Sequence, residues 1–406
     1  MALLLLVYTF NFIDRQIVGI LAIPIKADLG LSDTQLGLMG GLAFALFYTS
    51  LGIPIALLAD RANRTWIITI SLALWSLMTA VCGLAQNFWH LFLARLGVGV
   101  GEAGGTAPSY SLITDYFPPQ QRARALAVYA FGIPVGSAIG IAFGGVISSL
   151  IDWRVAFFAV GLAGVLLAPI FKWAVREPPR GRYDRTPRPA KPATLAEVMR
   201  VLLRKPSFWL ITLAGSSASM AGYGLIFWLP SFFVRSFSIS LIEASLLYGA
   251  MLLVGGIIGL WFGGVLADRM GRKSRAAYGL VPAAAFALTV PFFVFGVIAP
   301  DLWLAAMVLS VPTALSLGWL GPTLAAIQHM APPYMRATTS AIFLFVNNLL
   351  GIGLGTTLIG AISDGLTHEF GDQGLRYAIL SATVFYVTAA AIFWLASSRL
   401  ARDWED

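Results

Sequence analysis

Four ionisable residues lie inside stretches of the sequence that are otherwise apolar. Asp14 and Arg15 interrupt the run LLLLVYTFNFIDRQIVGIL, and Arg95 and Glu102 lie in LFLARLGVGVGEAGG. An ionised side chain at the centre of a bilayer costs roughly 2.5–3.5 kcal/mol on insertion scales, and such residues usually face a protein interior or a water-filled cavity. A chain that keeps two acids and two bases in such places is expected to use them.

The chemistry of these four residues suits the coupling of proton movement to the binding of an anionic group. A carboxylate that is surrounded by apolar residues and also touches a guanidinium can change its protonation state when water reaches it. Arginine stays charged and binds phosphate in a bidentate manner. We therefore assign Asp14 and Glu102 as proton-coupling candidates, and Arg15 and Arg95 as groups for a substrate headgroup or as counter-charges.

Helical geometry limits how these four side chains can meet. Arg95 and Glu102 are seven residues apart, almost two helical turns, so both project from one face. Asp14 and Arg15 are adjacent and point about 100° apart. We expect Glu102 to lie near Arg15 or Arg95, and Asp14 to bound the same cavity. The alternative is a static charge cluster that locks the first and fourth helices together.

The composition of the 406-residue chain is that of an all-α membrane protein. Apolar residues make up 58%, charged residues 11%, and the mean hydropathy is +0.81, whereas soluble domains are about 25% charged. Apolar runs such as WIITISLALWSLMTAVCGLA are long enough for helices, while barrel strands would alternate over about ten residues. The sequence predicts twelve transmembrane helices, at 2–24, 34–58, 66–86, 89–114, 123–148, 154–175, 207–234, 243–267, 275–298, 302–329, 336–362 and 374–398.

The basic residues gather on one side of the predicted topology. With both termini on the same side, that side holds 21 of the 27 Lys and Arg residues, so the positive-inside rule predicts cytoplasmic termini. Topology thus accounts for the net charge of +8, and no nucleic-acid motif is present. The single cysteine, Cys82, excludes an internal disulfide and offers no metal cluster.

The sequence contains an internal repeat, and each half is predicted to form a six-helix bundle. ALLADRANRT at 56–65 aligns with GVLADRMGRK at 264–273, and PPQQRARALA at 118–127 aligns with PPYMRATTSA at 332–341. Paired repeats of this kind are the architecture of transporters with a midplane site between the halves. We predict an N-terminal bundle at 1–175, a linker at 176–206, a C-terminal bundle at 207–398 and a cytoplasmic tail at 399–406. Thr194 and Glu197 fit a capping box for a linker helix at the membrane surface.

The C-terminal half differs from the N-terminal half because no charged residue lies in the middle of its spans. Charge on one wall and apolar surface on the other suits an amphiphile, since each buried CH₂ contributes about 0.8 kcal/mol. The candidates to line the pathway there are Tyr223, Phe227, Trp228, Asn347 and Asn348. In the fifth span, Gly136, Gly140 and Gly144 follow the spacing that permits close helix contact, and we expect a helix of the other half to pack there.

Several of these motifs resemble those of the major facilitator superfamily. GVLADRMGRK resembles its loop signature, and the N-terminal copy is degenerate because Ala56 and Asn63 replace glycines. RLGVGVGEA at 95–103 resembles the fourth-helix motif. Within the superfamily, NFIDRQIVG, VGVGEAGGTAPSY and FGIPVGSAIG resemble spinster-type transporters, in particular a bacterial spinster homologue.

This resemblance implies the movement of lysolipids, such as lysophospholipid-like or sphingosine-phosphate-like molecules, with coupling to protons. It also implies that charged residues at the cytoplasmic helix ends tie the two halves together when that side is closed. The residues expected in this cytoplasmic gate are Asp60, Arg61, Asp115, Arg122, Asp268, Arg269 and Arg272.

The sequence therefore predicts a secondary active transporter of lysolipid-like amphiphiles that works by alternating access and is coupled to protons. The alternative is a proton-coupled symporter or exporter of a small organic anion or drug. We expect no enzymatic activity, no cofactor and no metal, with the proton gradient as energy source. The expected partners are a lipid-like substrate, protons and the bilayer of a bacterial inner membrane, and the expected state is a monomer.

Overall fold

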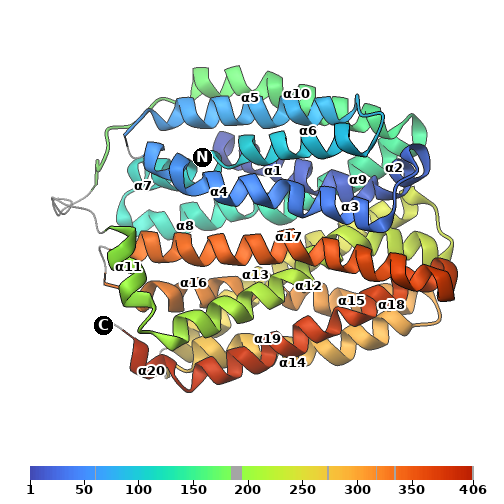
Figure 1. Ribbon diagram of the computed structural model, residues 1–406. Coiled ribbons are helices and arrows are strands. Elements are labelled where there is room, and N and C mark those ends of the chain that lie inside the picture. The colour runs from blue at the N-terminus through green and yellow to red at the C-terminus, as the bar shows by residue number, and fades with distance from the viewer. Residues whose placement is uncertain (60, 184–193, 272–273, 317, 333–334, 405–406) are drawn as a thin grey trace. The chain divides into compact units, whose positions relative to one another are not determined.

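The protein is helical wherever the structure shows it. A computed structural model describes residues 1–59, 61–183, 194–271, 274–316, 318–332 and 335–404, and this part of the chain contains helices and no strand (Figure 1). The prediction of an all-α fold is confirmed.

The first ten helices account for the N-terminal half of the sequence. They are α1 (Ala2–Ile20), α2 (Ala22–Leu29), α3 (Asp33–Gly40), α4 (Leu42–Ala59), α5 (Arg64–Cys82), α6 (Phe88–Glu102), α7 (Thr106–Tyr116), α8 (Pro119–Ala130), α9 (Gly132–Leu150) and α10 (Trp153–Ala174). A short helix, α11 (Leu195–Leu202), follows in the predicted linker.

The remaining helices form the C-terminal half. They are α12 (Pro206–Phe237), α13 (Leu241–Gly271), α14 (Ala277–Ile298), α15 (Leu302–Leu315), α16 (Leu320–His329), α17 (Arg336–Phe370), the 3₁₀ turn η2 (Gly371–Gln373), α18 (Gly374–Ser381), α19 (Thr383–Ser397) and α20 (Leu400–Asp403).

Ten stretches of the described chain are long and apolar enough to cross a membrane. One of them, Thr338–Ser397, contains two of the predicted spans. The predicted fourth span is not among the ten because a turn at 103–105 divides it into α6 and α7. With these two adjustments, every one of the twelve predicted spans corresponds to helix in the structure.

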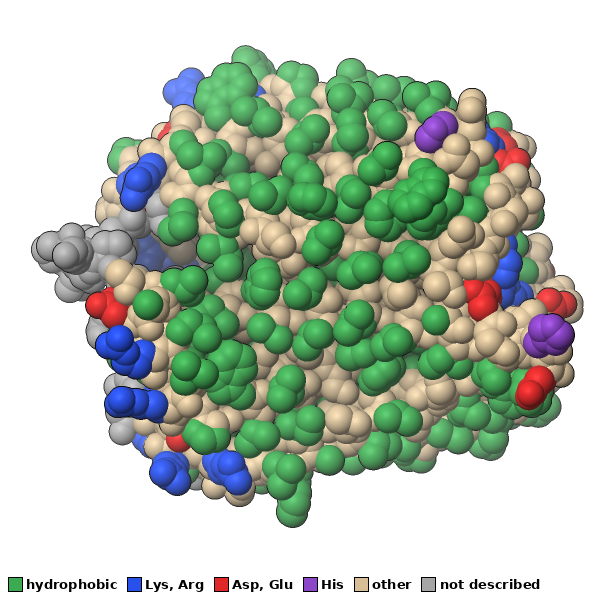
Figure 2. All heavy atoms as spheres, viewed as in Figure 1, with side chains coloured by type: hydrophobic (Ala, Val, Ile, Leu, Met, Phe, Trp, Pro, Cys, Tyr) green, Lys and Arg blue, Asp and Glu red, His purple; other side chains and the backbone are tan. Residues whose placement is uncertain are grey.

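The protein's surface suits a hydrocarbon solvent. Large apolar side chains are exposed along the helices, among them Trp261 at 63%, Trp303 at 69% and Leu166 at 68%. In the face shown in Figure 2, apolar side chains cover the lengths of the helices and charged ones gather where helices end. A contiguous apolar surface of this kind marks contact with a membrane or a partner, and the hydropathy of the helices favours the membrane.

The chain folds into two compact units. Unit 1 comprises Met1–Pro187 and Ile226–Leu253, and unit 2 comprises Arg188–Leu225 and Val254–Asp406. The long helices α12 and α13 each contribute to both units, because the boundaries fall within them. Unit 1 therefore includes the adjoining ends of these two helices in addition to α1–α10.

In unit 1, glycines let α9 approach α1 closely. A Cβ atom added at Gly136 would lie 2.4 Å from the backbone oxygen of Thr9, and one at Gly140 would lie 2.7 Å from that of Ile13. Gly144 likewise meets side chains of α1. These three glycines therefore contact α1 and not, as had been predicted, a helix of the other half, although α9 does meet α13 of that half beside them, where a Cβ at Gly145 would lie 2.3 Å from the Ser245 side chain. Spacing by four residues defines one face of a helix, but it does not say which helix covers that face.

The fourth predicted span is interrupted next to one of its ionisable residues. Pro108 has no N–H to donate to the carbonyl of Gly104, and its ring disfavours a continuous helix. A turn therefore follows Glu102, the last residue of α6. The glycines of α6 also bring it close to its neighbours: a Cβ at Gly99 would lie 2.5 Å from the Phe44 oxygen, and one at Gly101 would lie 2.5 Å from the Trp75 nitrogen.

Unit 2 encloses an aromatic core. Phe286 of α14 stacks on Tyr386 and Phe393 of α19, with ring centroids 5.8 and 6.0 Å apart, and Trp319 packs beside them. Asp403 of α20 accepts a hydrogen bond of 2.8 Å from the backbone N–H of Ser207 at the start of α12. Among the described residues of unit 2, Asp403 is the only buried charged residue.

The predicted linker helix exists, with its capping box. The Thr194 hydroxyl accepts from the Glu197 N–H, and the Glu197 carboxylate accepts from the Thr194 N–H. These hydrogen bonds lower the pKa of Glu197. Val198 and Leu202 are fully buried, and α11 packs against α17. Val198 and Leu202 thus pack against protein, whereas Leu195 of the same helix is 55% exposed, and the position at the membrane surface stays a prediction.

Candidate functional site

The four ionisable residues of the N-terminal spans meet inside unit 1. Arg15 of α1 donates through Nε to Glu102 Oε2 of α6 at 2.8 Å. Arg95 Nη1 of α6 lies 3.9 Å from Asp14 Oδ1 of α1, which is an ion pair without a hydrogen bond. Glu102 therefore lies beside Arg15, as expected. We call these four residues the central charge cluster.

Side-chain length explains how two adjacent residues reach partners that are seven positions apart. Seven residues span about 10 Å along a helix axis. Asp14 and Arg15 project in different directions, and the long guanidinium side chains cover the remaining distance. Helix α1 packs against α9, α10 and α5, and its two charged side chains extend to α6. Each arginine thus pairs with the acid of the other helix.

The cluster is buried and its formal charge is balanced. Side-chain exposure is 0% for Glu102, 1% for Asp14, 1% for Arg95 and 11% for Arg15. Arg95 Nε and Nη1 and Glu102 Oε1 have no hydrogen-bond partner within the part of the chain that is described. Buried polar atoms are normally satisfied, so these three atoms have unused hydrogen-bonding capacity.

Aromatic rings surround the arginine that retains some exposure. The Arg15 guanidinium carbon lies 4.5 Å from the ring centroid of Tyr48 and 4.9 Å from that of Phe44. Phe12 lies on a third side at 5.2 Å. Cation–π contacts of this kind stabilise a desolvated cation and hold it in place. Arg15 is therefore fixed at the accessible edge of the central charge cluster.

One member of this site, a threonine, could not be predicted from the sequence. Thr79 of α5 is fully buried, and its hydroxyl lies 2.6 and 2.5 Å from the two carboxylate oxygens of Asp14. A threonine in an apolar helix gives no signal, because most such hydroxyls bond to their own helix. Thr69, on the same helix, does so by donating to the Thr65 carbonyl at 2.7 Å.

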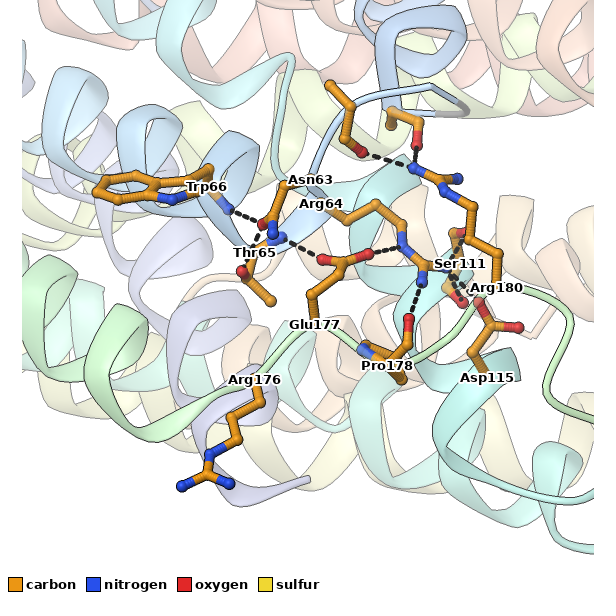
Figure 3. A network of polar contacts seen from close by, with 12 residues as sticks. Asn63, Arg64, Thr65, Trp66, Ser111, Asp115, Arg176, Glu177, Pro178 and Arg180 are labelled. Carbon is orange, nitrogen blue, oxygen red and sulfur yellow. Dashed lines mark hydrogen bonds and ion pairs between the residues drawn. The ribbon is translucent and has the colours of Figure 1, made fainter.

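A second buried charge cluster lies in unit 1 at the loop between α4 and α5 (Figure 3). Arg64 is fully buried and makes five hydrogen bonds. Its Nε donates to Glu177 at 2.7 Å, and Nη1 donates to Asp115 at 2.5 Å and to the hydroxyl and carbonyl of Ser111. Nη2 donates to the carbonyl of Pro178 at 3.2 Å.

The segment that follows α10 closes this cluster from the other side. Glu177 also accepts from the Thr65 N–H at the start of α5, at 3.0 Å. Arg180 donates to the carbonyls of Ala59 and Ala62, at the end of α4 and just beyond it. A carboxylate at a helix N-terminus and a guanidinium at a C-terminus both suit the helix dipoles. Residues 176–181 therefore form a strap that holds the α4–α5 loop in place. The sequence had indicated only a linker in this segment.

The residues predicted for a cytoplasmic gate are dispersed among different surroundings. Asp115 belongs to the Arg64 cluster and also accepts from the Gly181 N–H at 3.0 Å. Arg122 donates to the carbonyls of Thr114 and Phe117 at the end of α7. Arg61 and Arg269 are exposed. Asp60 and Arg272, and the side chain of Asp268, lie outside the described residues.

The predicted pathway-lining residues are mostly buried. In unit 1, Phe227 is 5% exposed and contacts Gly19 and Gly40, and Trp228 is fully buried beside it. In unit 2, Asn347 is 4% exposed and accepts from the Ser219 hydroxyl at 3.0 Å. Tyr223 and Asn348 are half-buried. No group of three or more metal-ligating side chains occurs among the residues that the structure describes.

Long apolar helices around a buried, charge-balanced cluster are typical of a multi-pass membrane transporter. The chain belongs to the Major Facilitator Superfamily, which it matches over residues 4–356. Within that superfamily it is of the Spinster type.

Three similarities define this position. The chain is 33% identical to a bacterial homologue of the human lysosomal transporter Spinster. The crystal structure of that bacterial homologue is in an inward-facing and unoccupied conformation. The TM-score between the two structures is 0.90, and the comparison covers 100% of this chain and 98% of that chain. It is 30% identical to protein spinster homolog 1 of Xenopus laevis, over 97% of this chain and 79% of that protein. It is 35% identical to an MFS-type efflux pump of Mycolicibacterium smegmatis, over 98% of this chain and 92% of that protein.

Proposed function

We propose that this protein is a secondary active transporter of lysolipid-like amphiphiles, driven by protons through alternating access. The observation that carries the proposal is the central charge cluster, in which Arg15 bonds Glu102 at 2.8 Å and Asp14 pairs with Arg95 at 3.9 Å. Four ionisable groups inside membrane-spanning helices are costly to insert. A static brace between two helices could be built from apolar packing at lower cost.

Proton coupling is assigned to the two acids. Asp14 and Glu102 are each adjacent to one arginine, so each acid has a charged form that is paired and a neutral form that suits its apolar surroundings. The unsatisfied Oε1 of Glu102 leaves a position where a proton or a water molecule can bind. Protonation of either acid would release its arginine to pair with another anion.

The substrate headgroup is assigned to Arg15, and the counter-charge to Arg95. Arg15 has the greatest side-chain exposure of the four residues, 11%, and its rigid fork suits phosphate or carboxylate. Unit 2, taken by itself, offers an apolar and aromatic interior for binding a chain, with amides at Asn347 and Asn348. The resemblance of the motifs NFIDRQIVG and VGVGEAGGTAPSY to spinster-type transporters implies a lipid-like substrate.

A second candidate function is the export of a drug or a small organic anion. The 35% identity to an efflux pump of Mycolicibacterium smegmatis favours this alternative. The two functions share the central charge cluster and differ in the cargo. A small anion would gain from a second buried cation elsewhere in the chain, and unit 2 has no buried Lys or Arg among its described residues.

We further propose that the protein lies in the bacterial cell membrane with both termini in the cytoplasm. The distribution of Lys and Arg along the chain supports this orientation. The proton gradient would supply the energy without any bound cofactor, and a monomer would suffice because both halves of the transporter lie in one chain. The strap at 176–181 and the Arg64 cluster would then rigidify the cytoplasmic side of unit 1.

The test is a flux assay on the purified protein in liposomes. Labelled lysophospholipid, a sphingoid phosphate and a cationic drug are each tested with and without a pH gradient. We expect saturable lysolipid flux that the gradient stimulates, and we expect Asp14→Asn and Glu102→Gln to remove that stimulation. Glu243→Gln is the matched control, because Glu243 is an exposed capping residue of α13.

Each outcome separates the candidates. If the protein transports the drug but neither lysolipid, the second candidate function replaces lysolipid transport. Wild-type stimulation by the gradient in both Asp14→Asn and Glu102→Gln would refute proton coupling through the cluster. Flux that neither saturates nor shows counter-exchange would indicate a pore instead of a carrier.

A further inference from the structure

The carboxylate of Asp14 depends on a single neutral hydroxyl for its hydrogen bonding. Thr79 Oγ1 lies 2.6 Å from Oδ1 and 2.5 Å from Oδ2, and no other hydrogen-bond donor to Asp14 occurs among the described residues. The nearest cation, Arg95, is at 3.9 Å and beyond hydrogen-bond distance. Asp14 is 1% exposed and Thr79 is fully buried, so bulk water does not compete for this contact.

A hydroxyl is suited to both protonation states of an acid. It has one O–H to donate to an ionised carboxylate, and it has lone pairs that accept from a protonated one. Arginine, in contrast, has donors only and favours the charged state alone. The ionised carboxylate has about four acceptor sites, so a single donor leaves it poorly satisfied. Loss of that donor would therefore affect the ionised state more than the neutral state.

The other groups that face Asp14 are accounted for. The titratable side chains near it on α1, α5 and α6 are Arg15, Cys82, Arg95 and Glu102. Helix α9, which packs along α1, has no titratable residue. Helix α10 has Arg154 and Lys172, and these interact elsewhere, with Asp28 and with Thr65. Thr79 is thus the one neutral hydrogen-bonding partner of Asp14 within the described chain.

We propose that Thr79 is a positioning residue for proton coupling, which holds Asp14 and sets the pH at which that acid exchanges its proton. The inference rests on the proposed function, because it assumes that Asp14 carries the coupled proton. It adds a third helix, α5, to the coupling site of α1 and α6. Movement of α5 relative to α1 would then change the proton affinity of Asp14 directly.

The test compares Thr79→Val with Thr79→Ser, and with Thr69→Val as the matched control on the same helix. Proton-driven lysolipid flux is measured against pH in liposomes for each variant and for Asp14→Asn. We expect Thr79→Val to move the pH midpoint of flux to more alkaline values by about one unit, since a hydrogen bond to a charged group corresponds to at least a ten-fold change in equilibrium. Thr79→Ser keeps the hydroxyl and should retain the wild-type midpoint, as should Thr69→Val.

A second readout is independent of flux. The infrared C=O stretching band of protonated Asp14, assigned by its loss in Asp14→Asn, should change frequency in Thr79→Val but not in Thr69→Val. If Asp14→Asn abolishes the pH dependence while Thr79→Val shows the wild-type midpoint and the wild-type band, the role of Thr79 is refuted. If Asp14→Asn itself keeps the wild-type pH profile, the proposed coupling function fails instead.

Discussion

Replacing Arg64 by methionine should be one of the most destabilising single changes in unit 1. The guanidinium is fully buried and makes five hydrogen bonds, two of them to the carboxylates of Asp115 and Glu177. Without it, two acids face each other with no counter-charge. Breaking a buried ion pair by removing one partner costs about 3–5 kcal/mol, and we expect Arg64→Met to lower the free energy of unfolding by that amount.

The matched change at the opposite end of the contact should cost much less. Glu177→Gln leaves Arg64 and Asp115 as a balanced pair, and the amide oxygen can still accept from Nε. Glutamine has one acceptor oxygen where glutamate has two, so the variant loses the hydrogen bond from either Arg64 or the Thr65 N–H. This loss should lower the free energy of unfolding by about 1 kcal/mol. Glu177 is also 22% exposed, which further reduces the penalty.

The assay is reversible unfolding in mixed micelles with increasing SDS, followed by tryptophan fluorescence. Arg61→Met is the control, because Arg61 is an exposed residue of the same loop and should change stability by about 0.5 kcal/mol or less. The reasoning is refuted if Arg64→Met lies within about 1 kcal/mol of the wild type. It is also refuted if Glu177→Gln is as damaging as Arg64→Met.

Two further changes test the packing of α9 on α1 and the ion pairs that Asp33 of α3 makes with Lys26 and Arg235. Gly140→Val should destabilise the protein by at least about 1–3 kcal/mol, because its Cβ would meet the α1 backbone at 2.7 Å. Gly52→Ala should instead stabilise it by roughly 0.5–1 kcal/mol, because no atom lies within 4 Å of the new Cβ. Equal effects of the two variants in the same unfolding assay would contradict this prediction. Asp33→Asn should cost about 3–5 kcal/mol, since the fully buried carboxylate accepts from Arg235 at 2.7 and 2.8 Å and from Lys26 at 2.6 Å; a change below about 1 kcal/mol would show that these cations do not need their counter-charge.

The sequence was most informative about the positions of the helices and least informative about which residues contact one another. Hydropathy located the twelve spans, because a helix in lipid must be long and apolar. The break after Glu102 could also have been predicted, since Gly104, Gly105 and Pro108 all disfavour a continuous helix. The expectation that Glu102 lies near Arg15 or Arg95 followed from the cost of leaving a buried acid unpaired. The sequence did not determine which acid would meet which arginine.

Contacts between distant segments explain what was missed. Arg64 and Glu177 are separated by 113 positions, and Thr79 and Asp14 by 65. No periodicity links such pairs, and a single threonine in an apolar helix resembles many others. The glycine stripe of α9 shows the same limit, because its spacing predicted close packing and its true neighbour, α1, emerged only from the fold.

The solitary thiol of Cys82 has a practical consequence. It is fully buried in unit 1, so water-soluble maleimides should leave it unmodified. Pairs of new cysteines at exposed positions such as Arg61 and Glu243 could then carry spin labels or fluorophores on an otherwise unaltered chain. Spectroscopic distances recorded during turnover would report the motions of the transporter directly, without first engineering a thiol-free background.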